Sequence, residues 1–352
     1  PDTVKAYVKR GLAVAVEAGA GAGAYFTDDA YSAAGASVVA AAECVKDADI
    51  ILTVRRPSAA VVKAAKAGAV LIAQMNPHDG KDELRGLAQN GLNVFSMELM
   101  PRISRAQSMD VLSSQANLAG YKSVITAAEH FSRAFPQMMT AAGTVSPARV
   151  FVMGVGVAGL QAIATARRLG AIVSATDVRK ATEEQVKSLG GKFIFADVAD
   201  AATAGGYAKE LSDEDKAKQA ALIAEHIKTQ DIIITTALIP GRPAPELVSQ
   251  AMVESLKPGS VIVDLAAERG GNCPLTKAGE TIVHQGVTII GAVNLAGALA
   301  GNASSLYARN LQNFLDLIVT KDGALAMDWE DEIIKGTALV KQGVAVHPLL
   351  NA

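Results

Sequence analysis

The sequence of 352 residues has few cysteines, few aromatic residues and no long apolar run. Its two cysteines, Cys44 and Cys273, are far apart and lack the spacing of metal ligands. Aromatic residues make up 4 % of the chain, and no uninterrupted apolar run approaches the roughly 20 residues of a membrane span. We therefore predict no metal site and no transmembrane segment in this chain, and a reduced, cytoplasmic setting fits.

The charged residues and histidines also do not form the patterns that are typical of nucleic-acid binding or of catalytic sites. The net charge is −2, so no surplus of basic residues predicts a nucleic-acid partner. No two histidines have H-x-x-x-H or paired spacing, and no Ser/His/Asp or Cys/His arrangement stands out. We interpret all of them as solvated or structurally satisfied: His78, His130, His226, His284 and His347.

What the chain has in abundance is small and aliphatic apolar residues. Apolar residues reach 50 %, carried mostly by Ala and Val, with 31 glycines. This composition is typical of buried parallel strands beneath alanine-rich helices. A chain of this length favours two domains.

The strongest positive signal is the stretch Arg149–Asp177, RVFVMGVGVAGLQAIATARRLGAIVSATD. It predicts an apolar strand, a complete G-x-G-x-x-G over Gly154–Gly159, an alanine-rich helix, a second apolar strand and then an acid. The glycine pattern alone is weak. In this order of strand, turn, helix, strand and acid it is typical of dinucleotide binding.

Each part of this stretch has a physical role in holding a dinucleotide. Gly154 permits a tight turn, Gly156 lets the backbone approach a pyrophosphate, and Gly159 lets the helix pack closely on the sheet. Free N–H groups and the positive end of the helix dipole would face the phosphates. Asp177 can accept hydrogen bonds from both ribose hydroxyls and would repel a 2′-phosphate, which favours NAD over NADP. Arg179 opposes this, because an arginine can accommodate that phosphate.

Alternating helix and strand signals surround this stretch and predict an α/β fold. We expect two Rossmann-like, doubly wound parallel-sheet subdomains joined by two long helices, near 113–135 and 303–318. The first would comprise 1–120 and 303–352, with an N-terminal piece of the subdomain missing from this chain. The NAD-binding subdomain would comprise 121–302. Thr140–Pro147 would be a linker into the glycine-turn strand.

Two further segments suggest contacts with a ligand. The loop at 97–113 gathers Arg102, Gln107 and Asp110, whose donors and acceptors could hold a nicotinamide carboxamide. The alternative is an exposed loop with Asp110 as a helix N-cap. The segment Ala199–Lys209, ADAATAGGYAK, is either a mobile flap over a ligand or a surface loop.

Several runs together resemble one family. MELMPRISRAQSMD, GVGVAGLQAIATARRLGA, ATDVR, TAGGYAKE, TTALIPGRPAP and VDLAAERGGNCP are similar to domain I, the NAD(H)-binding component of proton-translocating, Si/Re-specific NAD(P) transhydrogenase. Alanine dehydrogenase shares the fold and the glycine pattern but not the PRISRAQSMD loop.

The resemblance implies a role in direct hydride transfer. NAD(H) would bind on this chain and NADP(H) on a partner domain, domain III. The partner is attached to a membrane domain that translocates protons. The chain would form a homodimer on the cytoplasmic, matrix-equivalent side of the inner membrane. No acid or base is expected, since neither nicotinamide ring releases a proton.

The resemblance also implies which residues contact the nucleotide, with Gln107 positioning the ring for catalysis. Those expected at the nicotinamide end are Arg102, Ile103, Ser104, Gln107, Asp110 and Ser113. Those expected at the pyrophosphate are Gly154, Gly156, Val157, Ala158 and Gly159. Those expected at the adenosine ribose are Asp177, Val178 and Arg179. The others expected to line the site are Gly206 and Tyr207 on the mobile loop, and Gln219, Ala237 and Leu238.

Two other functions stay open at this point. The first is an NAD-dependent, alanine dehydrogenase-like amino-acid oxidoreductase. In alanine dehydrogenase a Lys and a His handle the amino acid. Here Arg55 or Arg56 is near the Lys position, Met75 or Asn76 is near the His position, and His78 lies close by. The second is a nucleotide-sensing module without turnover.

Overall fold

The computed structural model describes residues 1–88, 91–196 and 213–351. The chain divides into two compact units, one of Pro1–Gln115 with Ala300–Ala352 and one of Ala116–Leu299. The division after Gln115 lies within α6 (Val111–His130), and the division after Leu299 lies directly before α11 (Ala300–Leu315). The boundaries expected from the sequence are after 120, within α6, and after 302, within α11.

The second unit is built on a seven-stranded sheet that is parallel except for β13. Its strands in sheet order are β10 (Lys192–Phe193), β9 (Ile172–Thr176), β8 (Arg149–Met153), β11 (Ile232–Thr235), β12 (Val261–Asp264), β14 (Val287–Gly291) and β13 (Thr281–His284). The helices are α7 (Val157–Arg168), α8 (Glu183–Ser188), α9 (Asp213–Ile227), α10 (Gln250–Glu254) and most of α6. The first strand of this sheet in the sequence, β8, lies in the middle. The next strands, β9 and β10, extend the sheet to one side, and β11, β12 and β14 extend it to the other, as in a Rossmann fold.

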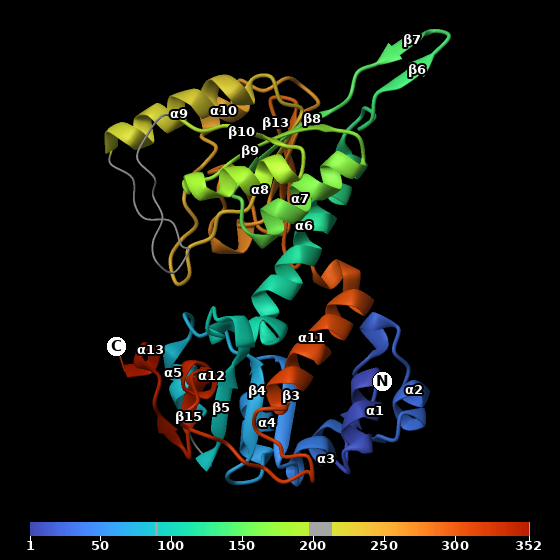
Figure 1. Cartoon of the computed structure of the whole chain (residues 1–352), viewed down its shortest axis with the longest axis vertical. Helices are drawn as coiled ribbons and strands as arrows, with labels where there is room; N and C mark the ends of the chain where they lie inside the picture. The colour runs from blue at the N-terminus through green and yellow to red at the C-terminus, as the bar shows by residue number, and fades with distance from the viewer. Residues whose placement is uncertain (89–90, 197–212, 352) are drawn as a thin grey trace. The chain divides into compact units, whose positions relative to one another are not determined.

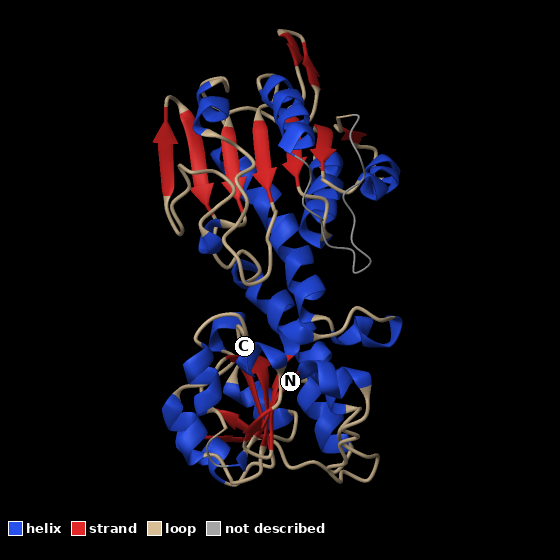
Figure 2. Ribbon diagram, turned by 90° about the vertical axis from the view of Figure 1, so that its left-hand side faces the viewer, coloured by secondary structure: helices blue, strands red, loops and turns tan. Residues whose placement is uncertain are grey.

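Both faces of this sheet are buried, which explains its continuous apolar strands. Along β8, Val150 and Val152 pack with α6 and α7, whereas Phe151 and Met153 pack with α9 and α10. Figures 1 and 2 show helices on both sides of the sheet. On α7, the small side chain of Ala162 is fully buried, so the helix backbone can approach the strands closely.

The first unit has a mixed five-stranded sheet and a separate parallel pair of strands. The sheet order is β16 (Val344–Ala345), β15 (Ala338–Lys341), β5 (Asn93–Ser96), β4 (Val70–Gln74) and β3 (Ile50–Arg55), and the pair is β1 (Ala15–Glu17) with β2 (Ser37–Val39). The helices are α1 (Asp2–Lys9), α2 (Asp28–Ala33), α3 (Ala41–Lys46), α4 (Ala59–Ala64), α5 (Lys81–Gly86), α11, α12 (Glu332–Thr337) and α13 (Pro348–Asn351). β3, β4 and β5 are parallel, and β15 pairs antiparallel with β5.

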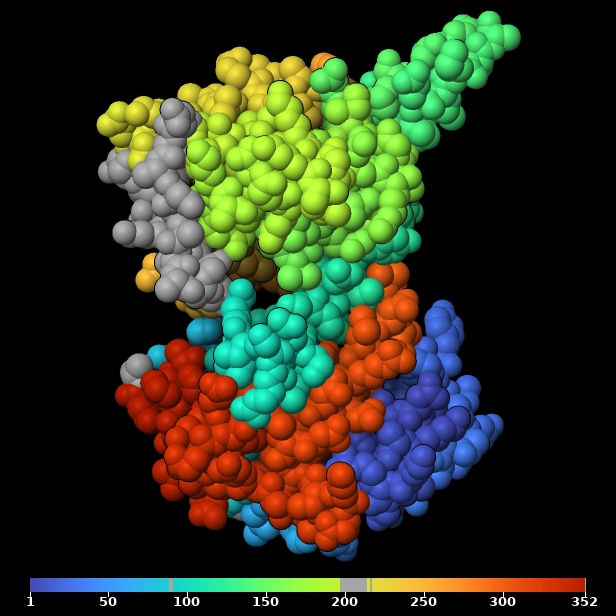
Figure 3. All heavy atoms as spheres, in the orientation of Figure 1, coloured from blue at the N-terminus to red at the C-terminus, as the bar shows by residue number. Residues whose placement is uncertain are grey.

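The structure corrects the expectation of a linker at Thr140–Pro147. A short antiparallel hairpin, β6 (Met138–Thr140) and β7 (Gly143–Val145), stands clear of the rest of its unit (Figure 3). All of its strand residues are exposed, so it has no buried face that would produce an alternating apolar pattern in the sequence. The α/β class and the Rossmann-like architecture are confirmed. No helix in the described ranges is long and apolar enough to cross a bilayer.

Candidate nucleotide-binding site

The glycine turn joins β8 to α7 at the carboxyl edge of the second unit's sheet. Gly154 has φ +102°, and a Cβ there would lie 2.5 Å from the hydroxyl oxygen of Thr236. A Cβ on Gly159 would overlap the carbonyl oxygen of Gly154. Among the described residues, no atom lies within 4 Å of a Cβ placed on Gly156. Gly154 and Gly159 are therefore required because neither position has room for a side chain. Gly156 instead has open space beside its backbone.

The start of α7 presents backbone N–H groups at this turn. Gly156 is the N-cap residue, and no described side chain accepts from the N–H groups of the first turn. The next residue, Val157, is 39 % exposed. Because these N–H groups and the helix dipole favour negative charge, the backbone of Gly156–Gly159 fits a pyrophosphate.

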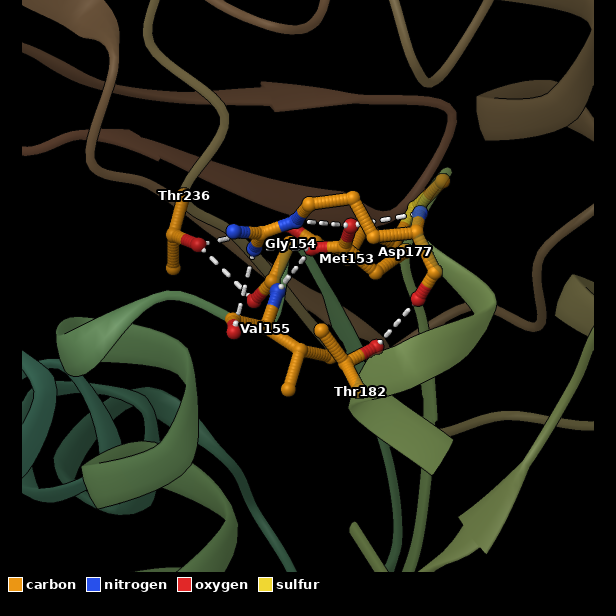
Figure 4. A network of polar contacts seen from close by, with 7 residues as sticks. Met153, Gly154, Val155, Asp177, Thr182 and Thr236 are labelled. Carbon is orange, nitrogen blue, oxygen red and sulfur yellow. Dashed lines mark hydrogen bonds and ion pairs between the residues drawn. The ribbon is translucent and has the colours of Figure 1, made fainter. Parts of the chain in front are cut away.

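Asp177 follows β9 directly, and its side chain is only 7 % exposed. Its Oδ2 accepts a hydrogen bond from the backbone N–H of Val155 at 2.8 Å, which joins the carboxylate to the glycine turn (Figure 4). Its Oδ1 accepts from the backbone N–H of Arg179 at 2.9 Å. The acid predicted for the ribose is therefore fixed beside the glycine turn.

The structure adds a feature that the sequence did not predict at this carboxylate. The Arg179 guanidinium donates from Nε to Asp177 Oδ1 at 2.8 Å and from Nη2 to Oδ2 at 2.9 Å. This pairing raises the pKa of Arg179. With two backbone donors also present, about four acceptor positions of the carboxylate are occupied. Asp177 is thus not an open acceptor, and a ribose hydroxyl has to replace one of these donors. Thr182 steadies the same turn by donating to the Arg179 carbonyl at 2.8 Å.

Four other predicted residues lie in the same unit, near the carboxyl ends of β9 and β11. Gln219 is buried; it donates to Thr176 Oγ1 at 2.8 Å and accepts from the N–H of Ala196 at 2.8 Å. It therefore supports the end of β9 rather than projecting its amide outward. Ala237 and Leu238 follow β11, and Leu238 is 51 % exposed. Val178 is half-buried between Asp177 and Arg179.

The predicted nicotinamide loop lies in the first unit and is anchored by its backbone. The Ser108 carbonyl accepts from Asn310 Nδ2 at 2.8 Å and from Asn313 Nδ2 at 2.9 Å. Ala106 and Met109 are buried beneath the same segment. The predicted contact residues with exposed side chains are Arg102, Ser104 and Gln107; Ile103 is half-buried. A fixed backbone thus presents side chains that reach the surface.

Asp110 and Ser113 are brought together, in a capping arrangement. Asp110 Oδ1 accepts from the backbone N–H of Ser113 at 3.0 Å, and the Ser113 hydroxyl donates to Oδ2. This is the N-cap that the alternative interpretation of the loop required. The flap residues Gly206 and Tyr207, and the whole Ala199–Lys209 prediction, lie outside the described residues.

Arg56, one of the two arginines that the sequence places near the lysine position of alanine dehydrogenase, has a structural role. Arg56 donates to the carbonyls of Met75 at 2.6 Å and Asp79 at 2.6 Å, and it pairs with Glu83 at 2.7 Å. Its charge therefore holds the loop that follows β4. The predicted site residues did not include two buried residues of the second unit, Asp264 and Asn272. Both lie in the run VDLAAERGGNCP that carries the family resemblance, but only the fold shows that Asn272 bonds to Ala237, 35 positions away.

Comparison with known proteins identifies the family. Models for the alanine dehydrogenase/PNT N-terminal and C-terminal domains match residues 1–119 and 123–348. The chain is 54 % identical to an NAD(P) transhydrogenase subunit alpha polypeptide of Rhodospirillum rubrum, covering 100 % of this chain and 94 % of that relative. A transhydrogenase structure from Sinorhizobium meliloti matches with a TM-score of 0.89 at 56 % identity, covering 98 % of this chain and 94 % of that one.

A solved L-alanine dehydrogenase matches with a TM-score of 0.81 at 24 % identity, covering 100 % of this chain and 93 % of that one. At that identity the likeness shows the fold alone. The high identity to the transhydrogenase subunit extends over the full length of the chain, including both units. The chain therefore belongs to the alanine dehydrogenase/PNT family, within the group of NAD(P) transhydrogenase alpha subunits.

Proposed function

We propose that this chain is the NAD(H)-binding component of a proton-translocating transhydrogenase. The observation that carries the proposal is the glycine turn with Asp177 bonded to its backbone. Gly156 leaves room for a pyrophosphate, and the carboxylate lies at the end of the next strand, where an adenosine ribose binds in this fold. The relatives named as transhydrogenase alpha subunits support the same role.

The charge beside the ribose position supports NAD rather than NADP. A buried carboxylate repels a 2′-phosphate, and Arg179 neutralises that carboxylate instead of standing apart as a phosphate ligand. Ribose binding then exchanges one donor on Asp177 for a hydroxyl. The contribution of this exchange to affinity is small compared with a new hydrogen bond, because one bond replaces another.

Bound NADH would supply a hydride for NADP+ on a partner chain. The residues of this chain bind and orient the nucleotide. We propose that Gln107 adjusts the nicotinamide ring, with Arg102 and Asp110 nearby on the anchored loop. Direct transfer needs two rings close, aligned and shielded from water, and it requires no proton from the protein.

The partners in this proposal are an NADP(H)-binding domain, a membrane domain that translocates protons, and a second copy of this chain. The chain would lie on the cytoplasmic side, held at the membrane by those partners. Met138 and Met139 on the hairpin are 44 % and 80 % exposed, which supports a contact with another protein surface. Sedimentation of the purified chain tests the homodimer.

The alternative is an NAD-dependent amino-acid dehydrogenase, favoured by the shared fold. Arg56 speaks against it, because its guanidinium is engaged with backbone carbonyls in the region where alanine dehydrogenase handles its substrate.

Two assays separate these functions. The chain mixed with NADH, NADP+ and the NADP(H)-binding domain of a related transhydrogenase should transfer hydride, and either protein alone should not. The chain mixed with NAD+ and L-alanine should produce no NADH. Steady NADH formation would establish the alternative. Binding of NADH without transfer in the complete mixture would leave a nucleotide-sensing module.

A further inference from the structure

One buried asparagine closes the loop that follows β11. Asn272 is fully buried, at 0 % exposure. Its Oδ1 accepts from the backbone N–H of Ala237 at 3.1 Å, and its Nδ2 donates to the Ala237 carbonyl at 2.9 Å. The same Nδ2 donates to the Pro245 carbonyl at 2.7 Å. A single amide thus binds both ends of the segment from Ala237 to Pro245.

Asn272 is itself held rigidly by a second buried group. Asp264, also 0 % exposed, accepts from the Asn272 N–H at 2.7 Å and from Thr276 Oγ1 at 2.7 Å. Gly271 has φ +84°, and a Cβ there would lie 2.8 Å from Asp264 Oδ2. Displacing Asn272 would leave a buried carboxylate short of a donor, which is costly. The asparagine is therefore a fixed support.

The strand order shows on which side of the glycine turn Asn272 and the loop after β11 lie, along the carboxyl edge of the sheet. β8 carries the glycine turn and is followed by β9 and Asp177 on the adenosine side. On its other side β8 pairs with β11, and β11 pairs with β12. The strand order reverses between β8 and β11, and a Rossmann sheet binds one half of a dinucleotide on each side of this point. The loop after β11 therefore belongs to the nicotinamide half.

Leu238 is the residue that this arrangement presents. It directly follows the clamped Ala237 and is 51 % exposed at the carboxyl edge. Both backbone groups of Ala237 are bonded to Asn272, so the peptide plane before Leu238 cannot rotate freely. An apolar side chain held in this way can pack against the face of a nicotinamide ring, and binding then pays no entropy cost for ordering the loop.

We propose that Asn272 is a positioning residue for the nicotinamide end of the bound dinucleotide. It acts through Ala237 and Leu238 and does not touch the nucleotide itself. This inference rests on the proposed NAD(H) site and adds a support that the glycine pattern does not contain.

The test compares NADH with ADP-ribose, which lacks the nicotinamide ring. Asn272→Ala should weaken NADH by about tenfold, the equivalent of roughly 1.4 kcal/mol. The same variant should change ADP-ribose affinity by less than about twofold. Both dissociation constants are measured by calorimetry on the full chain. A merely structural role would weaken both ligands equally, and that result would overturn the proposal.

A matched control is available in the first unit. Asn93 is 5 % exposed and also bridges two backbone segments, donating to the Gly68 carbonyl at 3.2 Å and accepting from the Gln342 N–H at 2.9 Å. Asn93→Ala should leave the ratio of NADH to ADP-ribose affinity unchanged. If Asn272→Ala does not fold, Leu238→Ala at the exposed position should reproduce the selective loss of NADH. An equal effect on both ligands would again overturn the proposal. Failure of the unaltered chain to bind NADH would instead refute the proposed function.

Discussion

The two groups of predicted site residues are built in different ways. In the second unit, the glycine turn depends on backbone fit: Gly159 has no room for a side chain, and the buried Asp177 bonds to the turn itself. In the first unit, the backbone of the loop is anchored at Ser108, and Gln107 reaches the surface. Under the proposed function, the rigid turn is the end that binds the nucleotide, and the loop with a fixed backbone and an exposed side chain is the end that positions the ring.

The largest expected effect comes from filling the packed glycine. Gly159→Ala places a methyl group on the Gly154 carbonyl, so the turn or α7 must shift. We expect the free energy of unfolding to fall by about 3 kcal/mol and NADH binding to be lost. Denaturant unfolding and NADH fluorescence measure the two effects. Unchanged stability would show that the helix can move away without cost.

Gly156→Ala is the matched variant that separates packing from binding. Its Cβ meets no described atom within 4 Å, and its backbone at φ −85° suits any residue. Stability should change by less than about 1 kcal/mol. NADH affinity should fall by about tenfold or more, because the methyl group occupies the phosphate position. Full NADH affinity would place the pyrophosphate elsewhere.

The next effect concerns the ribose end. Asp177→Ala should weaken NADH by about 1–3 kcal/mol, because it removes the ribose contact and also the carboxylate that holds the Val155 N–H of the glycine turn. Asp231→Ala is a suitable control: this carboxylate is 6 % exposed and accepts from the Arg149 N–H at 2.9 Å, at the amino end of β11. It should reduce stability without selective loss of NADH. A normal NADH dissociation constant for Asp177→Ala would contradict the ribose assignment.

The positioning end should respond in rate rather than in affinity. Gln107→Asn shortens an exposed side chain on an anchored loop and leaves the loop backbone in place. Hydride transfer to NADP+ on the partner domain should slow by about tenfold, with NADH affinity within about twofold. Single-turnover kinetics gives the rate. Equal losses in rate and affinity would remove the distinction between the two ends.

The smallest effect is predicted for a half-buried histidine on α9, which belongs to neither group of predicted site residues. Burial, with help from nearby Lys192 and Arg149, lowers the pKa of His226 below its ordinary value of 6.5. Its Nε2 lies 2.8 Å from Ser174 Oγ. The folded protein therefore stabilises the neutral form of His226. The contribution of neutral His226 to the free energy of unfolding is fully present above pH 6.5, and it is lost as the pH falls through the lowered pKa.

The unfolding free energies of the unaltered chain and of His226→Gln should therefore converge on acidification. Their difference is measured by denaturant unfolding at pH 7.5 and pH 5.5, and it should be smaller at the lower pH. NADH affinity at pH 7.5 should not change. A difference that grows on acidification would mean that the charged imidazole is the stabilised form.

The sequence was most informative where function depends on a contiguous stretch. The strand, glycine turn, helix and second strand of Arg149–Asp177 form the predicted unit. Glycine spacing, apolar runs and a following acid act within a few residues of each other. Their physical meaning therefore does not depend on the rest of the chain.

Other features could not be predicted because they depend on contacts between distant residues or on unpatterned surfaces. The exposed hairpin has no buried face to mark it, and β15 joins β5 although more than 240 positions separate them. Asn272 looks like any polar loop residue until Ala237 and Pro245 lie beside it.

By itself, the sequence determined that this chain has an α/β dinucleotide-binding turn, because that turn is local chemistry. Only the tertiary structure decided how the turn is completed. Arg179 donates hydrogen bonds to both carboxylate oxygens of Asp177, and Asn272 fixes Ala237, the residue before Leu238. The reason is physical: hydrogen bonds in a buried site are set by which groups meet after the sheet has formed.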